Sequence, residues 1–124
     1  MGTMTATEEI HHIWISGKVQ GVYYRNNTCD TANSLGLAGW CRNLEDTRVE
    51  VVAKGPSSKL FELREWCRRG PEMATVEKVD WKVLESVDED LTTPLKKIPK
   101  KHSPLNRGDL KVIEGSGGVL NGIK

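Results

Sequence analysis

The sequence predicts an α+β fold, with an antiparallel sheet of four to five strands and two helices packed on one of its faces. Two observations support this prediction. Apolar and polar residues alternate in four short segments, which is the period of a half-buried strand. Two other segments repeat apolar residues at helical spacing, and the order along the 124 residues is strand, helix, strand, strand, helix, strand. That order is the split βαβ plan.

The first strand and the first helix flank a loop with two glycines. Residues 13–16 alternate as a strand does, and residues 26–35 carry apolar side chains at helical spacing. Gly36 follows as a suitable stop for that helix. The loop, residues 17–25, therefore ends at the N-terminus of a helix.

Two further strands and the second helix follow. Residues 37–43 and 49–54 are strand-like, and the polar residues between them indicate a hairpin turn. Pro56 suits the first position of a helix, and Gly70 suits the position just after its end. Residues 79–83 alternate again and predict a fourth strand.

The two ends of the chain carry weaker patterns, so we expect a compact domain over residues 10–99. Residues 1–9 are small and polar, and are interpreted as a disordered lead-in. Residues 93–99 are the sole candidate for a fifth strand, limited by prolines to a short edge strand. Residues 100–124 show no sustained period and are expected to form a flexible basic tail.

The distribution of charge argues against nucleic acid as a partner. The net charge is +1, and the excess of positive charge lies in the C-terminal stretch beyond residue 95. Four lysines, Lys96, Lys97, Lys100 and Lys101, could form a small anion patch, but a solvated tail is the favoured interpretation. The sequence therefore does not predict a basic face along the whole chain.

Three cysteines, Cys29, Cys41 and Cys67, are expected to be small buried side chains in a reducing cytosol rather than metal ligands or disulfide partners. His11 and His12 are adjacent on a strand, so they point to opposite faces and are not expected to share a metal ion. No apolar run is long enough to span a membrane, and no secretory signal pattern is present. We therefore expect a cytoplasmic protein with no metal.

The loop before the first helix is a candidate anion site. Unpaired backbone N–H groups and the positive end of the helix dipole converge at a helix N-terminus. Gly17 and Gly21 let the backbone pass close to a ligand, and Arg25 adds a planar guanidinium suited to phosphate oxygens. By spacing alone, an ordinary glycine-containing connector followed by a surface arginine is the favoured interpretation.

Three stretches carry a resemblance to a known family. They read Gly17-x-Val19-Gln20-Gly21-Val22-x-Tyr24-Arg25, then Gly36-Leu37-x-Gly39-Trp40-x-Arg42-Asn43, then Val49-Glu50-Val51-Val52-Ala53-x-Gly55. In order and separation they closely resemble the motifs of acylphosphatases, and the resemblance extends over residues 10–85. It is specific, because two long ordered matches are hard to obtain by chance.

This resemblance implies a small cytosolic enzyme with a ferredoxin-like fold that hydrolyses acyl phosphates to a carboxylate and inorganic phosphate. It implies no metal and no organic cofactor, with inorganic phosphate as both product and inhibitor, and we expect a monomer. The family's phosphate-binding arginine falls on Arg25, and its catalytic asparagine, which orients the attacking water, falls on Asn43. Its amide cradle falls on a loop that comprises Gly17, Lys18, Val19, Gln20, Gly21, Val22, Tyr23 and Tyr24.

The sequence departs from the family pattern at three places. Tyr24 replaces a frequent phenylalanine, so its hydroxyl needs a hydrogen-bond partner. Thr47 replaces a frequent glycine, which predicts strain if the backbone there has positive φ. The fifth strand at residues 93–99 is weak, which puts the precision of the site in question more than the reaction class.

Two alternatives of other classes stay open from the sequence. One is a catalytically idle phosphate-binding or protein-interaction module on the same fold. The other is a single-stranded nucleic-acid binder, which is disfavoured because the aromatic and basic motif of such sheets is missing from the sequence. The presence of both Arg25 and Asn43 favours an enzyme.

Overall fold

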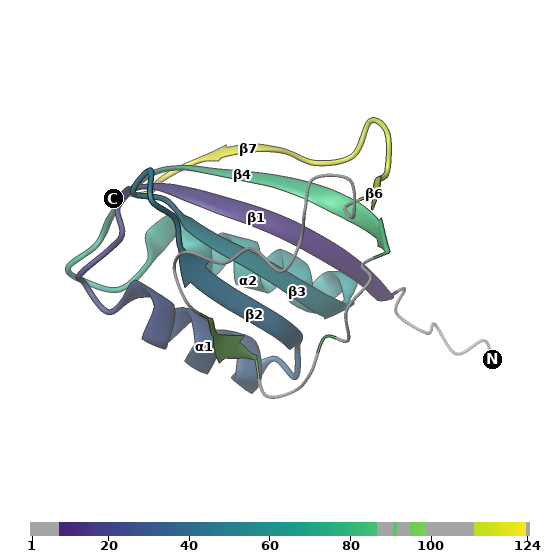
Figure 1. Ribbon diagram of the computed structural model, residues 1–124, viewed down its shortest axis with the longest axis horizontal. Helices are drawn as coiled ribbons and strands as arrows, with labels where there is room; N and C mark the ends of the chain where they lie inside the picture. The colour runs from purple at the N-terminus through teal and green to yellow at the C-terminus, as the bar shows by residue number, and fades with distance from the viewer. Residues whose placement is uncertain (1–7, 87–90, 92–94, 99–110, 124) are drawn as a thin grey trace.

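The computed structural model describes residues 8–86, 91, 95–98 and 111–123 (Figure 1). In chain order its elements are β1 (Glu8–Lys18), α1 (Tyr24–Ser34), β2 (Ala38–Asn43), β3 (Val49–Pro56), α2 (Ser57–Arg69), β4 (Thr75–Ser86), β5 (Lys96–Lys97), β6 (Lys111–Val112) and β7 (Gly118–Asn121). The predicted order of strand, helix, strand, strand, helix, strand is confirmed in the part of the chain from β1 to β4.

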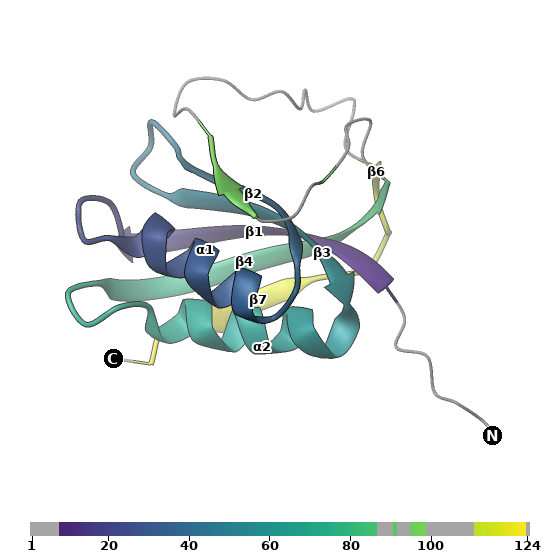
Figure 2. The same ribbon diagram turned by 90° about the horizontal axis from the view of Figure 1, so that it is seen from below.

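The sheet has the order β5-β2-β3-β1-β4-β6, with β7 also paired to β4. The four long strands pair antiparallel, whereas the two-residue β5 runs parallel to β2. Both helices cover the same face of the sheet (Figures 1 and 2). The predicted ferredoxin-like α+β fold is thus confirmed, with more strands at the edges than expected. No helix in the described ranges has the length and apolar character needed to cross a membrane.

The central strands are longer than the alternating pattern indicates. β1 pairs with β3 on one side and β4 on the other, and it includes Glu8 and Glu9, which we expected in a disordered lead-in. Residues 1–7 of that lead-in lie outside the described residues. Pro56 has extended backbone (φ −60°, ψ 139°) and precedes α2 instead of opening it. Periodicity underestimates β1 because the polar residues Glu8, Glu9, His11 and His12 hide the apolar alternation in its first half.

The two adjacent histidines point to opposite faces of β1, as predicted. On the helix face, Arg64 donates from Nη1 to His11 Nδ1 at 2.7 Å, so His11 carries its proton on Nε2 and donates it to Glu9 Oε1 at 2.8 Å. On the other face, His12 Nε2 lies 2.6 Å from Glu50 Oε2. Each histidine thus belongs to a separate network.

The His11 network predicts a loss of stability in mild acid. Burial lowers the pKa of His11 below 6.5; the hydrogen bond to Glu9 opposes this shift, and the charge of Arg64 adds to it. Because the folded pKa lies below the unfolded one, the unfolded chain binds more protons, so stability is full above pH 6.5 and falls as the pH drops below it. The urea midpoint should therefore fall between about pH 7 and pH 5.5.

A matched variant separates this effect from other titrations. His11→Gln keeps an acceptor for Arg64 but has no proton to gain, so its urea midpoint should change less over the same range. The pKa of Glu50 is raised by burial but lowered more strongly by His12 and Arg42, so its contribution is lost only below its ordinary value of 4.5. Equal slopes for wild type and His11→Gln would contradict the assignment.

Thr47 in the β2–β3 turn has φ of 81°, so the strain predicted from its position is present. A left-handed conformation costs about 1–2 kcal/mol in a residue with a Cβ, partly offset in glycine by the entropy of the unfolded chain. Thr47→Gly should therefore raise the free energy of unfolding by about 0.5–1 kcal/mol. Glu45→Gly, at an exposed turn position without positive φ, should lower it. A destabilised Thr47→Gly would show that the threonine is not strained.

The weak fifth strand is held by an asparagine of α1. Leu95 N donates to Asn33 Oδ1 at 2.6 Å, and Asn33 Nδ2 donates to Leu95 O at 3.3 Å. The Leu95 side chain is buried in the main core, the cluster of apolar side chains from the sheet and both helices that includes Ile13, Val51 and Leu63. In addition, Ile98 N donates to Cys41 O at 2.8 Å. This side-chain clamp replaces the long ladder that two prolines prevent, and it places β5 beside β2.

The structure differs from the expected flexible tail over residues 111–123. Gly118–Asn121 pairs with β4, and Arg68 Nε donates to Asn121 O at 2.9 Å. Gly117 has φ of 93°, and a Cβ there would lie 2.0 Å from Trp81 O. Glycines that resemble a linker in the sequence therefore allow a close backbone approach to the sheet. Residues 99–110 lie outside the described residues.

Candidate active site

The helix α1 begins at Tyr24, two residues earlier than predicted. Tyr23 precedes it in the left-handed conformation (φ 64°, ψ 21°), and no side chain caps this end of the helix. The first turn also carries no acidic residue. The N–H groups of Tyr24, Arg25 and Asn26 have no acceptor within the helix. An uncapped N-terminus with these orphan donors favours an anion.

The loop before α1 is anchored by its apolar side chains. Val19, Val22 and Tyr24 are all buried in the main core. The Tyr24 hydroxyl donates to Cys67 O at 2.8 Å, which supplies the partner that the sequence showed to be needed. Gly21 has φ of 75° and faces open space. Buried side chains on both sides of Gly21 hold the loop backbone in place.

Gln20 joins this loop to the β2–β3 hairpin. Its Nε2 donates to Leu44 O at 2.8 Å and to Arg48 O at 2.9 Å. These two carbonyls lie directly after Asn43 and directly before β3. The Gln20 side chain therefore ties the loop to the two ends of the turn that follows Asn43.

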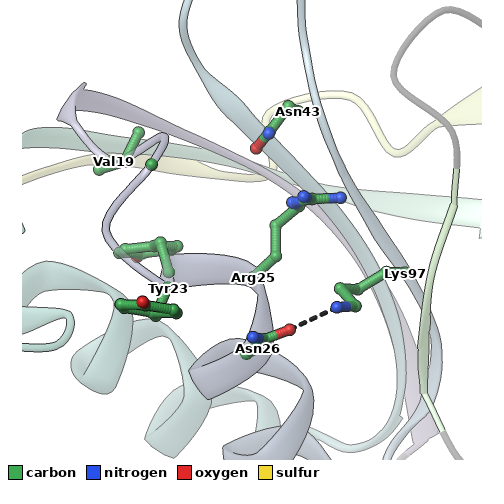
Figure 3. A pocket seen from close by; sticks show the side chains of 8 residues that line it. Val19, Tyr23, Arg25, Asn26, Asn43 and Lys97 are labelled. Atoms are coloured by element: carbon green, nitrogen blue, oxygen red, sulfur yellow. Dashed lines mark hydrogen bonds between the residues drawn. The ribbon is translucent and has the colours of Figure 1, made fainter.

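A cavity of about 270 Å³ lies where the loop, α1, β2 and β5 meet. It is lined by Val19, Gly21, Tyr23, Tyr24, Arg25, Asn26, Asn43 and Lys97. Figure 3 shows the Arg25 side chain rising from α1 toward the Asn43 carboxamide, with the Val19 loop beside both. The two residues predicted as catalytic, 18 positions apart in sequence, thus line a single cavity.

Asn43 has an unusual polar environment. Its Oδ1 is buried and has no hydrogen-bond partner among the described residues. A buried acceptor without a partner costs about 1–3 kcal/mol, so few are retained without a reason. Since Asn43 lines the cavity, a water molecule that reaches this oxygen would supply the missing hydrogen bond.

The predicted loop divides into residues that line the cavity and residues that do not. Val19, Gly21, Tyr23 and Tyr24 line it, together with Arg25. The other four do not line it. Gly17 and Lys18 lie at the end of β1, paired with β4, where the register shifts after Ser16. The Gln20 side chain donates to the β2–β3 turn, and the Val22 side chain packs into the core.

Two cavity residues were missed by the sequence interpretation. Lys97, which we expected in a solvated tail, reaches the cavity from β5, and its Nζ lies 2.5 Å from Asn26 Oδ1 (Figure 3). Asn26 was expected only as a tolerated first-turn residue. The sequence could not predict the position of Lys97, because it depends on the hydrogen bonds between Asn33 and the Leu95 backbone that hold β5 beside β2. The described lining of the cavity therefore includes two positively charged side chains, Arg25 on α1 and Lys97 on β5.

Comparison with known proteins identifies relatives over most of the chain. The acylphosphatase family model matches residues 11–93. An acylphosphatase of Marinobacter nauticus is 53% identical over 78 residues, which is 63% of this chain and 85% of the relative. One from Gloeobacter violaceus is 47% identical over 87 residues, which is 70% of this chain and 91% of the relative.

Solved structures agree with this match. An acylphosphatase from Coxiella burnetii superposes with a TM-score of 0.68 at 35% identity, covering 77% of this chain and all of that one. The acylphosphatase from Bacillus subtilis gives a TM-score of 0.67 at 28% identity, covering 73% and 98%. The family model spans more than half of the sequence, and the fold agrees with the solved acylphosphatase structures. This chain belongs to the acylphosphatase family.

Proposed function

We propose that this acylphosphatase binds the phosphoryl group of an acyl phosphate between the loop amides and Arg25, and that Asn43 orients the water that attacks phosphorus. The observation that carries the proposal is the shared cavity, which gathers a guanidinium, a free helix N-terminus and an unpartnered carboxamide oxygen. Each of these groups has a distinct task in hydrolysis.

The phosphoryl oxygens need donors that are already in place. The N–H groups of the loop from Val19 to Tyr24 and the positive end of α1 supply fixed dipoles. Arg25 supplies a charged donor that neutralises the oxygens as charge grows in the transition state. Since Val19 and Val22 anchor the loop in the core, little reorganisation is needed when substrate binds.

Water must approach phosphorus opposite the acyl oxygen. Asn43 Oδ1 accepts one hydrogen bond from this water and thereby aims its lone pair. The water oxygen forms a bond to phosphorus while the bond from phosphorus to the acyl oxygen breaks. The electron pair of that bond leaves with the carboxylate. An amide is too weak a base to take the proton, so the proton passes to a phosphate oxygen of the substrate.

The leaving group explains why the cavity can manage without a strong acid. A carboxylate leaves readily without protonation, so positioning and charge stabilisation carry the reaction. The described cavity lining contains no carboxylic acid and no histidine. This composition fits an acyl phosphate better than a phosphate ester of a simple alcohol, whose alkoxide would need a proton.

Lys97 is expected to strengthen binding of the doubly charged substrate. It is exposed, so its contribution is screened, and Lys97→Ala should raise KM and the inhibition constant of inorganic phosphate about 2–5-fold with little change in kcat. Lys96→Ala is the matched control, because Lys96 does not line the cavity. A collapse of kcat in Lys97→Ala, or equal KM changes in both variants, would contradict this role.

The activity itself is tested with benzoyl phosphate, with and without a chelator. Rapid hydrolysis of benzoyl phosphate that is unaffected by the chelator and is inhibited competitively by inorganic phosphate supports the proposal. Binding of phosphate without turnover would favour the idle module. We further infer a cytoplasmic monomer, and the free thiols fit a reducing compartment.

A further inference from the structure

Two cysteines that are apart in sequence meet behind the active site. Cys29 of α1 and Cys41 of β2 have their Sγ atoms 3.5 Å apart, and both are free thiols. A disulfide bond is about 2.0 Å long, so closing it needs roughly 1.5 Å of approach between the two sulfur atoms. This pair was not predicted from the sequence, because neither spacing nor a Cys-x-x-Cys motif links these positions.

The pair lies directly next to the two proposed active-site residues. Cys29 follows Arg25 by one helical turn, on the same side of α1. Cys41 precedes Asn43 by two residues, on the same face of β2. Cys41 Sγ also lies 3.9 Å from the backbone oxygen of Arg25. A bond between the sulfurs would therefore join the two elements that carry Arg25 and Asn43.

The two thiols differ in exposure and acidity. Cys29 is half-buried, whereas Cys41 is fully buried. The hydrogen bond from Cys41 lowers the pKa of Cys29; burial opposes this shift, and the positive charge of Lys97 supports it. The same hydrogen bond, together with burial, raises the pKa of Cys41. Cys29 is therefore the thiol that ionises, and Cys41 keeps the proton.

We propose that Cys29 and Cys41 are a reversible oxidation site at which a hydroperoxide closes a disulfide and lowers the hydrolase activity. The Cys29 thiolate attacks one peroxide oxygen and the oxygen–oxygen bond breaks, which gives a sulfenic acid and a hydroxide or alkoxide. The hydroxide or alkoxide takes a proton from solvent, equivalent to the one that Cys29 lost, and leaves as water or alcohol. Cys41 sulfur then attacks the Cys29 sulfur and expels hydroxide, which takes the Cys41 proton and leaves as water. The thiols lose two electrons and the peroxide gains them.

Closure changes activity because it moves parts of the site. The sulfurs must approach by roughly 1.5 Å, and the part of this approach that side-chain rotation does not supply must shift α1 relative to β2 beside Arg25 and Asn43. A misplacement of about 1 Å at reacting groups can lower a rate by about 10²-fold. We expect kcat/KM of the oxidised chain to fall by at least about tenfold and to return after treatment with a dithiol.

Hydrogen peroxide is the probe for this proposal. The reduced full chain is treated, digested without reductant and analysed by mass, while kcat/KM is followed on the same sample. The expected result is a crosslinked Cys29–Cys41 peptide whose formation parallels the loss of activity. A crosslink without any change in kcat/KM would overturn the regulatory part of the proposal. Absence of the crosslink would overturn the site itself, whatever the activity.

Variants keep the test independent of folding defects. Cys29→Ser and Cys41→Ala should each retain activity in peroxide that inactivates the wild type, with a native circular dichroism spectrum as the check on folding. Cys67→Ala is the matched control: burial raises the pKa of Cys67 to about 12, and it should remain as sensitive as the wild type. Continued sensitivity of Cys29→Ser would show that peroxide acts elsewhere. Since the crosslink is detected by mass, its failure is distinguishable from failure of the proposed hydrolysis.

Discussion

Arg25→Ala is expected to lower kcat/KM for an acyl phosphate by about 10²–10³-fold, because removal of one preorganised charge-stabilising donor typically has this effect. Arg25 lines the cavity at the start of α1, where the backbone donors alone cannot neutralise the transferred group. The loss should appear in both kcat and KM, since the phosphate is charged in the ground state as well as in the transition state. Steady-state kinetics on benzoyl phosphate measures it.

Two companion variants sharpen this prediction. Arg25→Lys should recover only part of the rate, because an ammonium is a point charge without the planar fork of a guanidinium. Arg69→Ala removes the same charge from an exposed site at the end of α2 and should leave kcat/KM close to wild type. If Arg25→Ala kept most of the wild-type rate, the role assigned to Arg25 would be wrong.

Asn43→Ala is expected to lower kcat by about 10²–10³-fold with little change in KM, because the side chain acts on water and not on substrate. Replacing a hydrogen-bonded polar side chain by alanine usually lowers the free energy of unfolding, but Asn43→Ala should not lower it. Asn43 Oδ1 has no partner among the described residues, so its removal relieves a penalty instead of creating one. We expect the free energy of unfolding to stay equal or to rise by up to about 1 kcal/mol.

The combination of lower activity and unreduced stability is the distinguishing result. Asn43→Asp tests whether residue 43 acts as a general base. A carboxylate is a stronger base than an amide, but it repels the phosphate dianion, so this variant should not reach the wild-type kcat. Asn121→Ala, on exposed β7, is the control for a substitution of the same kind away from the cavity. If Asn43→Ala unfolded at lower urea than wild type and kept its kcat, Asn43 would be a structural residue only.

The sequence predicted the arrangement of the main elements because period and capping dictate it. Alternating segments gave β1 to β4, and helical spacing with terminal glycines gave α1 and α2. The glycine loop at a helix N-terminus was a candidate anion site by physical reasoning, but the family resemblance was needed to favour that site over an ordinary connector. The assignment of Asn43, however, depended on the family resemblance, because an asparagine at a strand end is an ordinary turn residue.

What the sequence did not predict depends on contacts between distant segments. Gly117 and its neighbours look like a linker, but their missing side chains let residues 111–123 approach β4 closely. Lys97 looks like a tail lysine, yet the Asn33 clamp seats β5 beside β2 and brings it to the cavity. The Cys29–Cys41 contact likewise exists only after α1 packs on β2.

Titration of the reduced chain with inorganic phosphate, followed by the backbone amide NMR resonances, tests the central claim most directly. The account predicts saturable shifts confined to amides around Gly21 to Asn26 and to the Arg25 side chain, and their loss in Arg25→Ala. Shifts centred on another surface, such as the cavity lined by Lys82 and Ser116, would contradict it. Saturable binding that persists unchanged in Arg25→Ala would contradict it equally.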